Sequence, residues 1–265
     1  MEGRGVECGS NRGRVVEKSV TRNIKLVLEY DGAAFYGFQR QPRHHTVQET
    51  LEKALSQLLN APVRIHAASG RTDTGVHAMH QVVNFKTVSP LATHTLQRGL
   101  NALLPKTLAV RTAEEVEASF HARYDARFKV YEYRIWNDAV RSPLRAGHAW
   151  HVSQKLDRKA MRQAMAALKG RHDFRSFCAA HGSAKTTVRT IRRLSLRRQD
   201  AMLFFRVEAD GFLYHMVRNI VGTLVEVGRG KIRPEDVRKI LRACDRKQVG
   251  PTAPPGGLTL ASVTY

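Results

Sequence analysis

The segment with the clearest chemical potential runs from Ser69 to His77 and reads Ser-Gly-Arg-Thr-Asp-Thr-Gly-Val-His. Gly70 and Gly75 flank Arg71 and Asp73, and this spacing favours a tight loop from which a guanidinium and a carboxylate project together. Carboxylates serve enzymes in covalent and proton-transfer steps. An aspartate beside a glycine also commonly stabilises a turn through its own side chain. The residues of this loop leave both interpretations open.

A second interpretation of the same loop starts from the triplet Asp73-Thr74-Gly75, which is the signature of aspartic proteases. Those enzymes need two carboxylates that share one proton. The triplet occurs once in the chain, so a homodimer would have to provide the second carboxylate. Arg71 lies two residues before Asp73 and would keep the carboxylate ionised, which opposes proton sharing. We therefore set the protease interpretation aside.

The charge of the chain indicates the class of partner. Lys and Arg number 44 against 23 Asp and Glu in 265 residues, which gives a formal net charge of +21. Such an excess favours binding to phosphate backbones through counterion release, although a basic protein without a specific partner is the alternative. A single basic run is usually a solvated face. Several runs together predict phosphate contacts, and they comprise Arg40, Arg43, Arg189, Arg192, Arg193, Arg197 and Arg198.

The cysteines and the chain's beginning indicate the compartment. Cys8, Cys178 and Cys244 are odd in number and widely separated, which argues against a disulfide framework and against a Cys-x-x-Cys metal site. A reducing cytoplasm fits this pattern. No stretch approaches the ~18 apolar residues of a membrane span. Residues 1–22 mix acidic and basic residues without the apolar centre of a signal peptide, and we expect a flexible charged tail there.

Strands and helices must position this loop, and the first of them are predicted in the segments on either side of it. Residues 24–30 alternate apolar and polar side chains, which is typical of a strand with one buried face. Thr46-Val-Gln-Glu49 matches a capping box and predicts a helix with a leucine stripe after it. The same patterns predict strands at 63–67, 81–86 and 108–112 and a short helix at 96–104.

The second part of the chain shows the same style of patterning without a visible repeat. It predicts strands at 128–136, 188–196, 203–209 and 258–265, and helices at 156–168, 212–227 and 234–243. Strands and helices in this order indicate an α+β protein with a mainly antiparallel sheet. We expect a tail over 1–22, a first half over 23–116 with the Asp73 loop, and a second half over 117–265.

Beyond these patterns, Gly70-Arg-Thr-Asp-Thr-Gly-Val-His-Ala78 closely resembles the signature loop of the tRNA pseudouridine synthase A family. Further matching motifs follow in the same order, and the resemblance extends from about residue 23 to 265. Phe38 stands where many members have Trp, and the basic N-terminal tail is longer than usual. The other motifs are Glu29-Tyr-Asp-Gly32, Tyr36-Gly-Phe-Gln-Arg-Gln41, Phe120-His-Ala-Arg123, Lys129-Val-Tyr-Glu-Tyr133 and Tyr214-His-Met-Val-Arg-Asn-Ile-Val-Gly222.

The resemblance implies a fold and an activity. The fold would be two fused α/β-sandwich-like halves that share a continuous, mainly antiparallel sheet, with helices packed on one face and a basic active-site cleft between the halves. The enzyme would be a homodimer that isomerises uridine to pseudouridine at positions 38, 39 and 40 of the tRNA anticodon stem-loop. The reaction involves no redox change and no external group, so neither a cofactor nor a metal is expected.

The resemblance also implies roles for three catalytic residues. Asp73 would be the essential carboxylate, which either forms a covalent bond to sugar or base or removes a ribose proton to give a glycal. Arg218 would pair with it from a helix on which Val217, Ile220 and other apolar residues form one face. Tyr131 would stack on the target uracil, a contact worth roughly 1–3 kcal/mol per base, while we expect its neighbour Tyr133 in the core.

Substrate contacts are implied for three more residues. Arg71 would take the place of the extruded nucleotide or hold its phosphate, because an enzyme that acts on a stacked base must flip it out. Arg40 would contact the RNA. His77 is assigned to substrate binding, although it could instead orient the loop by a hydrogen bond.

The rival from another class is a non-catalytic RNA-binding protein or tRNA chaperone, which the net charge would support equally well. The combination of Arg71, Asp73, Tyr131 and Arg218 argues against it, because RNA binding needs no isolated carboxylate beside phosphates. Release of tritium from uracil carbon 5 would distinguish the two.

Overall fold

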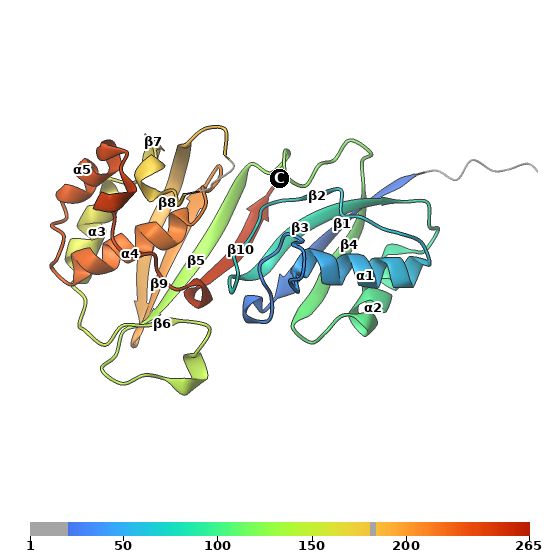
Figure 1. Cartoon of the computed structure of the whole chain (residues 1–265), viewed down its shortest axis with the longest axis horizontal. Coiled ribbons are helices and arrows are strands. Elements are labelled where there is room, and N and C mark those ends of the chain that lie inside the picture. Colours follow the sequence, from blue (N-terminus) through green and yellow to red (C-terminus); the bar gives the residue numbers. More distant parts are fainter. Residues whose placement is uncertain (1–20, 181–183) are drawn as a thin grey trace, which may run out of the picture.

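The fold is known from a computed structural model, which describes residues 21–180 and 184–265 (Figure 1). Its centre is a ten-stranded sheet whose main order is β4-β1-β3-β10-β5-β9-β8-β7, with β2 beside β3 and β6 beside β5. Residues 1–20 of the predicted tail lie outside the described residues. Within the described ranges, every helix is too short or too polar to span a lipid bilayer.

The first half builds one end of the sheet. The alternating side chains Ile24, Leu26 and Leu28 are fully buried, as are Leu51 and Leu55 of the helix that covers them, and all belong to one hydrophobic core. Thr46 caps that helix by accepting the Glu49 N–H, as the capping box predicts. The elements are β1 (Arg22–Tyr30), α1 (Val47–Leu59), β2 (Ala67–Ala68), β3 (His77–Thr87), α2 (Thr93–Leu103) and β4 (Leu108–Val116).

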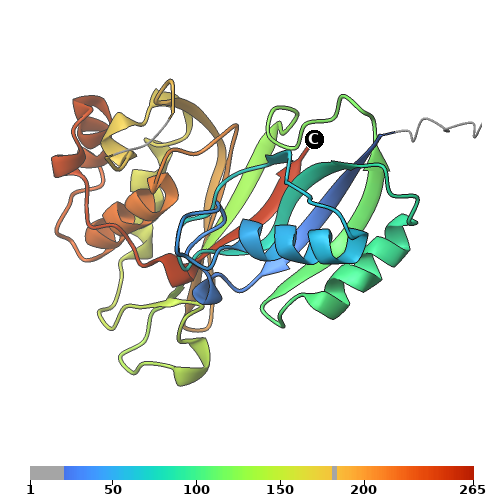
Figure 2. The ribbon, with the colours of Figure 1, turned by 45° about the vertical axis from the view of Figure 1, so that its right-hand side comes forward.

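The second half continues the sheet from β5, which coincides with the predicted strand. Its helices pack against the other end of the sheet, and α1 and α4 lie on the same face (Figures 1 and 2). The elements are β5 (Phe128–Trp136), β6 (Trp150–His151), α3 (Arg158–Ala166), β7 (Gly170–Asp173), β8 (Val188–Gln199), β9 (Met202–Ala209), α4 (Met216–Gly228), α5 (Asp236–Ala243) and β10 (Leu258–Thr264).

The last strand joins the two ends of the sheet. β10 runs parallel to β3, with Thr259 opposite His77, and antiparallel to β5, with Leu260 opposite Tyr131. All other pairings are antiparallel except that of β5 with β6. The predicted continuous, mainly antiparallel sheet is therefore confirmed, and the connection between β4 and β5 contains the predicted boundary of the halves.

The predicted strand at 63–67 is wrong for most of its length, because side chains of α1 take the backbone donors that a neighbouring strand would need. The N–H of Val63 donates to Ser56 Oγ at 3.0 Å, and the N–H of Ile65 donates to Glu52 Oε1 at 3.1 Å. Only Ala67 and Ala68 pair with β3.

Helix α4 differs from the prediction in both its start and its surroundings. It begins at Met216 rather than 212, because a tight turn brings the Met216 N–H to the Leu213 carbonyl at 3.1 Å. Twelve of its thirteen residues are buried, so the predicted single apolar face is too narrow; Arg218 is the exception. The sequence patterns also missed the short strands β6 and β7.

Candidate active site

The loop between β2 and β3 carries Asp73 and is anchored at its start by a buried amide. Gln81 on β3 accepts the Ser69 hydroxyl at Oε1 over 2.5 Å and donates its Nε2–H to the Gly70 carbonyl at 2.8 Å. Ser69 and Gln81 are both fully buried. A buried polar pair of this kind is costly to break, because each group would be left without a partner. The first turn of the loop is therefore fixed to the sheet.

The centre of the loop is held by a close backbone approach. Thr72 shares a 2.8 Å hydrogen bond with the Tyr30 hydroxyl, and its carbonyl accepts the Phe38 N–H at 3.1 Å. Gly37 packs against this stretch with φ +78°, and a Cβ on it would lie 2.8 Å from the Thr72 oxygen. Only glycine fits such a conformation and such an approach. Asp73 thus projects from a backbone fixed on both sides.

The carboxylate of Asp73 meets a guanidinium from the other half. Arg218 Nη1 donates to Asp73 Oδ2 at 3.2 Å, and Arg218 Nε donates to the Ala253 carbonyl at 2.8 Å. The side chains of Arg218 and Asp73 are 12% and 22% exposed, so the pair is only partly open to solvent. The pair predicted from the resemblance is therefore brought together.

Helix α4 is brought to this junction by a second close approach. A Cβ on Gly222 would overlap the carbonyl oxygen of Pro251, so the segment before β10 lies directly on the helix. The N–H of Ala253 in that segment donates to the Arg218 carbonyl at 3.2 Å. The guanidinium and its helix are thus held by the same stretch of chain.

Tyr131 lies beside the pair on the central strand β5 and is 7% exposed. Its ring meets Phe212 edge-on, with centroids 5.0 Å apart. Burial raises the pKa of the Tyr131 phenol, and the nearby Tyr30 and Asp73 raise it further, so the phenol stays protonated. Tyr133, two residues on, is fully buried and donates to the Pro254 carbonyl at 2.7 Å, which confirms the core position expected for it.

Comparison with known proteins decides the family. The family model described as tRNA pseudouridine synthase matches residues 26–125 and 164–265, which contain Asp73 and Arg218. The chain belongs to the tRNA pseudouridine synthase family. It is similar to proteins named tRNA pseudouridine synthase A from Acetivibrio thermocellus (46% identity over 92% of this chain and 100% of the relative), Citrifermentans bemidjiense (49%, 92% and 98%) and Chromobacterium violaceum (48%, 91% and 92%). As a pseudouridine synthase it is an isomerase.

The two arginines predicted to contact substrate differ in their surroundings. Arg71 is exposed on the loop that carries Asp73. Within residues 21–180 and 184–265, no ion pair involves its guanidinium. Arg40 is also exposed, but its Nη1 lies 3.3 Å from Glu52 Oε2 and its Nη2 lies 4.0 Å from Glu49. Part of the charge of Arg40 is therefore balanced within the protein, whereas Arg71 is available to a phosphate.

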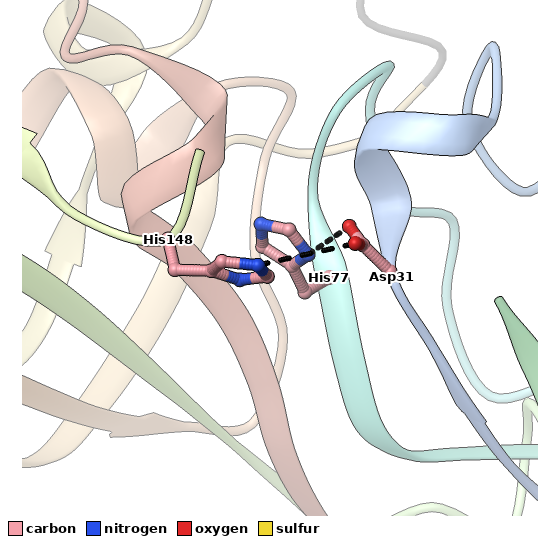
Figure 3. A group of neighbouring side chains, drawn as sticks. All are labelled: Asp31, His77 and His148. Carbon is pink, nitrogen blue, oxygen red and sulfur yellow. Dashed lines mark ion pairs between the residues drawn. The ribbon is translucent and has the colours of Figure 1, made fainter. Parts of the chain in front are cut away.

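His77 stands apart from the pair, in a group with Asp31 and His148 (Figure 3). Its Nδ1 accepts the Gly32 N–H at 3.1 Å, and its Nε2 lies 2.9 Å from the Gly147 carbonyl and 3.1 Å from that of Gly256. The Nδ1 atom also lies 3.0 Å from Asp31 Oδ1, and His148 Nε2 lies 3.9 Å from Asp31 Oδ2, so the three side chains contact one another directly. These contacts agree with the alternative expected for His77, in which it orients the loop by hydrogen bonds, and its contact with substrate stays a prediction.

Sequence analysis did not name two polar residues as site residues, of which one lies beside Asp73 and the other beside Gly70 of the same loop. His215 precedes α4, and its Nε2 lies 3.4 Å from Asp73 Oδ2. Lys129 lies on β5, where a Cβ on Gly70 would be 3.7 Å from its Nζ. The spacing of Lys129 and Tyr131, two apart on one strand, puts both on one face of the sheet and could have indicated the lysine. The position of His215 depends on a turn that its sequence does not signal.

Proposed function

We propose that this chain isomerises uridine to pseudouridine in the tRNA anticodon stem-loop, at positions 38, 39 and 40, with Asp73 as the catalytic carboxylate. The observation that carries the proposal is the ion pair of Asp73 with Arg218, at 3.2 Å and mostly shielded from solvent. The names of the relatives support tRNA as the substrate, whereas positions 38, 39 and 40 rest on the motif resemblance.

The chemistry asks little of the protein beyond one charged group and good positioning. The bond between ribose C1′ and uracil N1 breaks, the base turns, C1′ joins C5, and the proton on C5 leaves while N1 gains one. Asp73 contributes either by bonding covalently or by removing a ribose proton. Both routes need an ionised carboxylate, which the guanidinium of Arg218 stabilises.

The surroundings of the pair suit a flipped base and its phosphates. Tyr131 lies beside Asp73 with only 7% of its surface exposed, so stacking on uracil would require the flipped base to enter against it, and Arg71 is exposed on the same loop as Asp73. The chain's net charge of +21 favours a long polyanion such as tRNA. Recognition would depend chiefly on backbone shape, which is how proteins read folded RNA.

The competing function is RNA binding without catalysis. A binding surface gains nothing from a carboxylate among cations, because it would repel the phosphates that the arginines attract. The fixed position of Asp73 between the Thr72 contacts and Arg218 favours catalysis. We further propose that the enzyme acts as a cytoplasmic homodimer, which sedimentation of the purified protein would test for the oligomeric state.

The test uses tRNA transcripts labelled with tritium at uracil C5. Incubation with the protein should release tritium to water, and mapping of the modified tRNA should locate pseudouridine at 38, 39 or 40. Binding without any tritium release would leave the rival function. Release with pseudouridine elsewhere would retain the activity and reject the proposed target.

A further inference from the structure

His215 adopts a backbone conformation that residues with a Cβ rarely take. Its φ is +59° and its ψ is 6°, in the left-handed region, at the position that precedes α4. The surrounding hydrogen bonds hold this turn: the Asn219 N–H donates to the His215 carbonyl at 2.9 Å, and the Ala179 N–H donates to the Tyr214 carbonyl at 3.0 Å. Strained residues of this kind cluster at functional sites.

The turn places the imidazole close to the carboxylate that Arg218 already contacts. His215 Nε2 lies 3.4 Å from Asp73 Oδ2, the same oxygen that Arg218 Nη1 approaches to 3.2 Å. The ring packs on Tyr214, with centroids 3.9 Å apart, and the side chain is 21% exposed. Both basic groups therefore converge on one oxygen of Asp73.

Burial, together with two nearby guanidinium groups, favours the neutral form of the imidazole. Burial lowers the pKa of His215, and the nearby Arg218 and Arg246 lower it further, whereas Asp73 acts in the opposite direction. A neutral imidazole carries one N–H, and the nitrogen that faces a carboxylate oxygen is the one that gains by carrying it. His215 can thus donate to Asp73 without adding a second full positive charge beside Arg218.

We propose that His215 is a positioning residue of the synthase site, whose Nε2–H holds Oδ2 of Asp73 together with Arg218 and leaves Oδ1 as the oxygen that reacts with the substrate. This inference rests on the proposed function, in which Asp73 is the reacting carboxylate. The two atoms are 3.4 Å apart, which is long for a charge-assisted hydrogen bond. Contacts of this kind shorten when substrate fills the site.

The alternative for His215 is a purely structural role, in which only its backbone carbonyl and the packing of its ring matter. Three substitutions separate the two roles. His215→Gln brings an amide N–H close to the position of Nε2 and cannot titrate. His215→Phe keeps a ring on Tyr214 and removes the donor. His215→Gly relieves the left-handed backbone and removes the ring, so it remains informative if the Phe variant folds poorly.

The experiment measures single-turnover pseudouridine formation at saturating enzyme, tRNA dissociation constant and melting temperature for the parent and the three variants. His94→Gln on the exposed side of α2 is the control for a histidine change away from the site. We expect the Phe and Gly variants to be slower by about tenfold or more, with tRNA affinity within about threefold, because a hydrogen bond to a charged group is lost. The Gln variant should recover part of the rate.

Equal rates for the parent and His215→Phe would overturn the inference, because the ring alone would then suffice. A Gln variant that melts like the parent but is as slow as Phe would also overturn it, since a donor at that position would have no effect. A parent that releases no tritium from tRNA would instead reject the proposed function itself.

Discussion

The loop with Asp73 and the first turn of α4 meet in one ion pair, yet the chain holds them by different means. The start and centre of the Asp73 loop are fixed by the Tyr30 hydroxyl, the backbone at Gly37 and the amide of Gln81, all from the first half. Its end, at His77, also contacts the second half. The start of α4 is fixed by contacts with the segment that leads into the last strand, through Ala253 in particular.

Helix α4 is also held by a buried polar network inside the second half. Asn219 on α4 is fully buried and donates to the Phe177 carbonyl at 2.8 Å. Its Oδ1 accepts from Thr252 Oγ1 at 2.7 Å and from Arg246 Nη2 at 3.2 Å. The helix that supplies the counter-charge is therefore set by residues up to 42 positions away in the sequence. The contacts that fix the Asp73 loop span the same distance in sequence, since Tyr30 and Thr72 are also 42 positions apart. The two supports differ in the part of the chain that provides them and in the buried polar network, which belongs to α4.

The largest expected effect on stability comes from breaking the contact between α4 and the segment before β10. Gly222→Val would place side-chain atoms where the Pro251 carbonyl lies, and the helix cannot move away without exposing buried residues. We expect the free energy of unfolding to fall by about 3 kcal/mol, the upper end of the usual cost of overpacking. Urea denaturation measures this change, and a variant as stable as the parent would mean that the 251–253 segment moves freely away from α4.

Removing the counter-charge itself should affect catalysis more than folding. Arg218→Ala leaves Asp73 without its guanidinium and removes the contact to the Ala253 carbonyl, so we expect the single-turnover rate to fall on the order of 100-fold through misplacement of the carboxylate. Arg218→Lys should be faster than Ala but slower than the parent, because an ammonium cannot donate to both partners with a planar fork. If Arg218→Ala matched the parent rate, Arg71 would be the first candidate for the partner of Asp73.

Disturbing the support of the Asp73 loop should have a smaller effect, on both stability and activity. Gly37→Ala adds a Cβ 2.8 Å from the Thr72 oxygen at a positive φ. We expect a loss of about 1–3 kcal/mol in stability and about tenfold in single-turnover rate, since the strain falls beside Asp73. Gly230→Ala is the matched control, because its φ is +75° but a Cβ there has no neighbour within 4 Å. Equal activity losses in both variants would show that the close approach to Thr72 is irrelevant.

The smallest predicted effect concerns tRNA affinity and the charge of Lys129, which lies next to the start of the Asp73 loop. Burial, together with Arg123 and Arg189, lowers the pKa of Lys129 to about 8. A lysine is charged below its pKa, so the positive charge is present at pH 7 and largely lost at pH 9. If Lys129 contacts an RNA phosphate, tRNA affinity should weaken by about threefold to tenfold over that interval through loss of one ionic contact.

The matched variant for this prediction is Lys129→Arg, which keeps the charge at both pH values. Its tRNA dissociation constant should change less between pH 7 and 9 than that of the parent. The same pH dependence in both proteins would assign the effect to another group and remove Lys129 from the RNA interface.

Elements that depend on local sequence patterns were predicted well, whereas features that depend on contacts distant in the sequence were not. The β5 strand was predicted to the residue, and the Thr46 cap was predicted with its partner, because alternation and capping are local patterns. The strand predicted at 63–67 was wrong because the side chains of Glu52 and Ser56 accept backbone N–H groups of this segment. In a strand, those N–H groups would bond to a neighbouring strand. Local patterns cannot reveal that competition.

Prediction of the candidate site from sequence was limited in the same way. The spacing of glycines around Asp73 indicates a loop, and the resemblance provided Arg218 as its partner. Nothing near Arg218 in the sequence indicates that Ala253 will hold its Nε, or that His215 will take a left-handed conformation and face the same carboxylate. The contacts of His77 with Gly147 and Gly256 could not be predicted for the same reason, because both partners are distant in the chain.

The most direct test of the account is the chemistry of Asp73 itself. Asp73→Asn keeps the size of the side chain and its contact with Arg218 but removes the charge. Single-turnover isomerisation, followed by tritium release from uracil C5, should fall below detection, while tRNA affinity stays within about tenfold of the parent. Turnover by Asp73→Asn at a rate near that of the parent would contradict the assignment of the catalytic carboxylate.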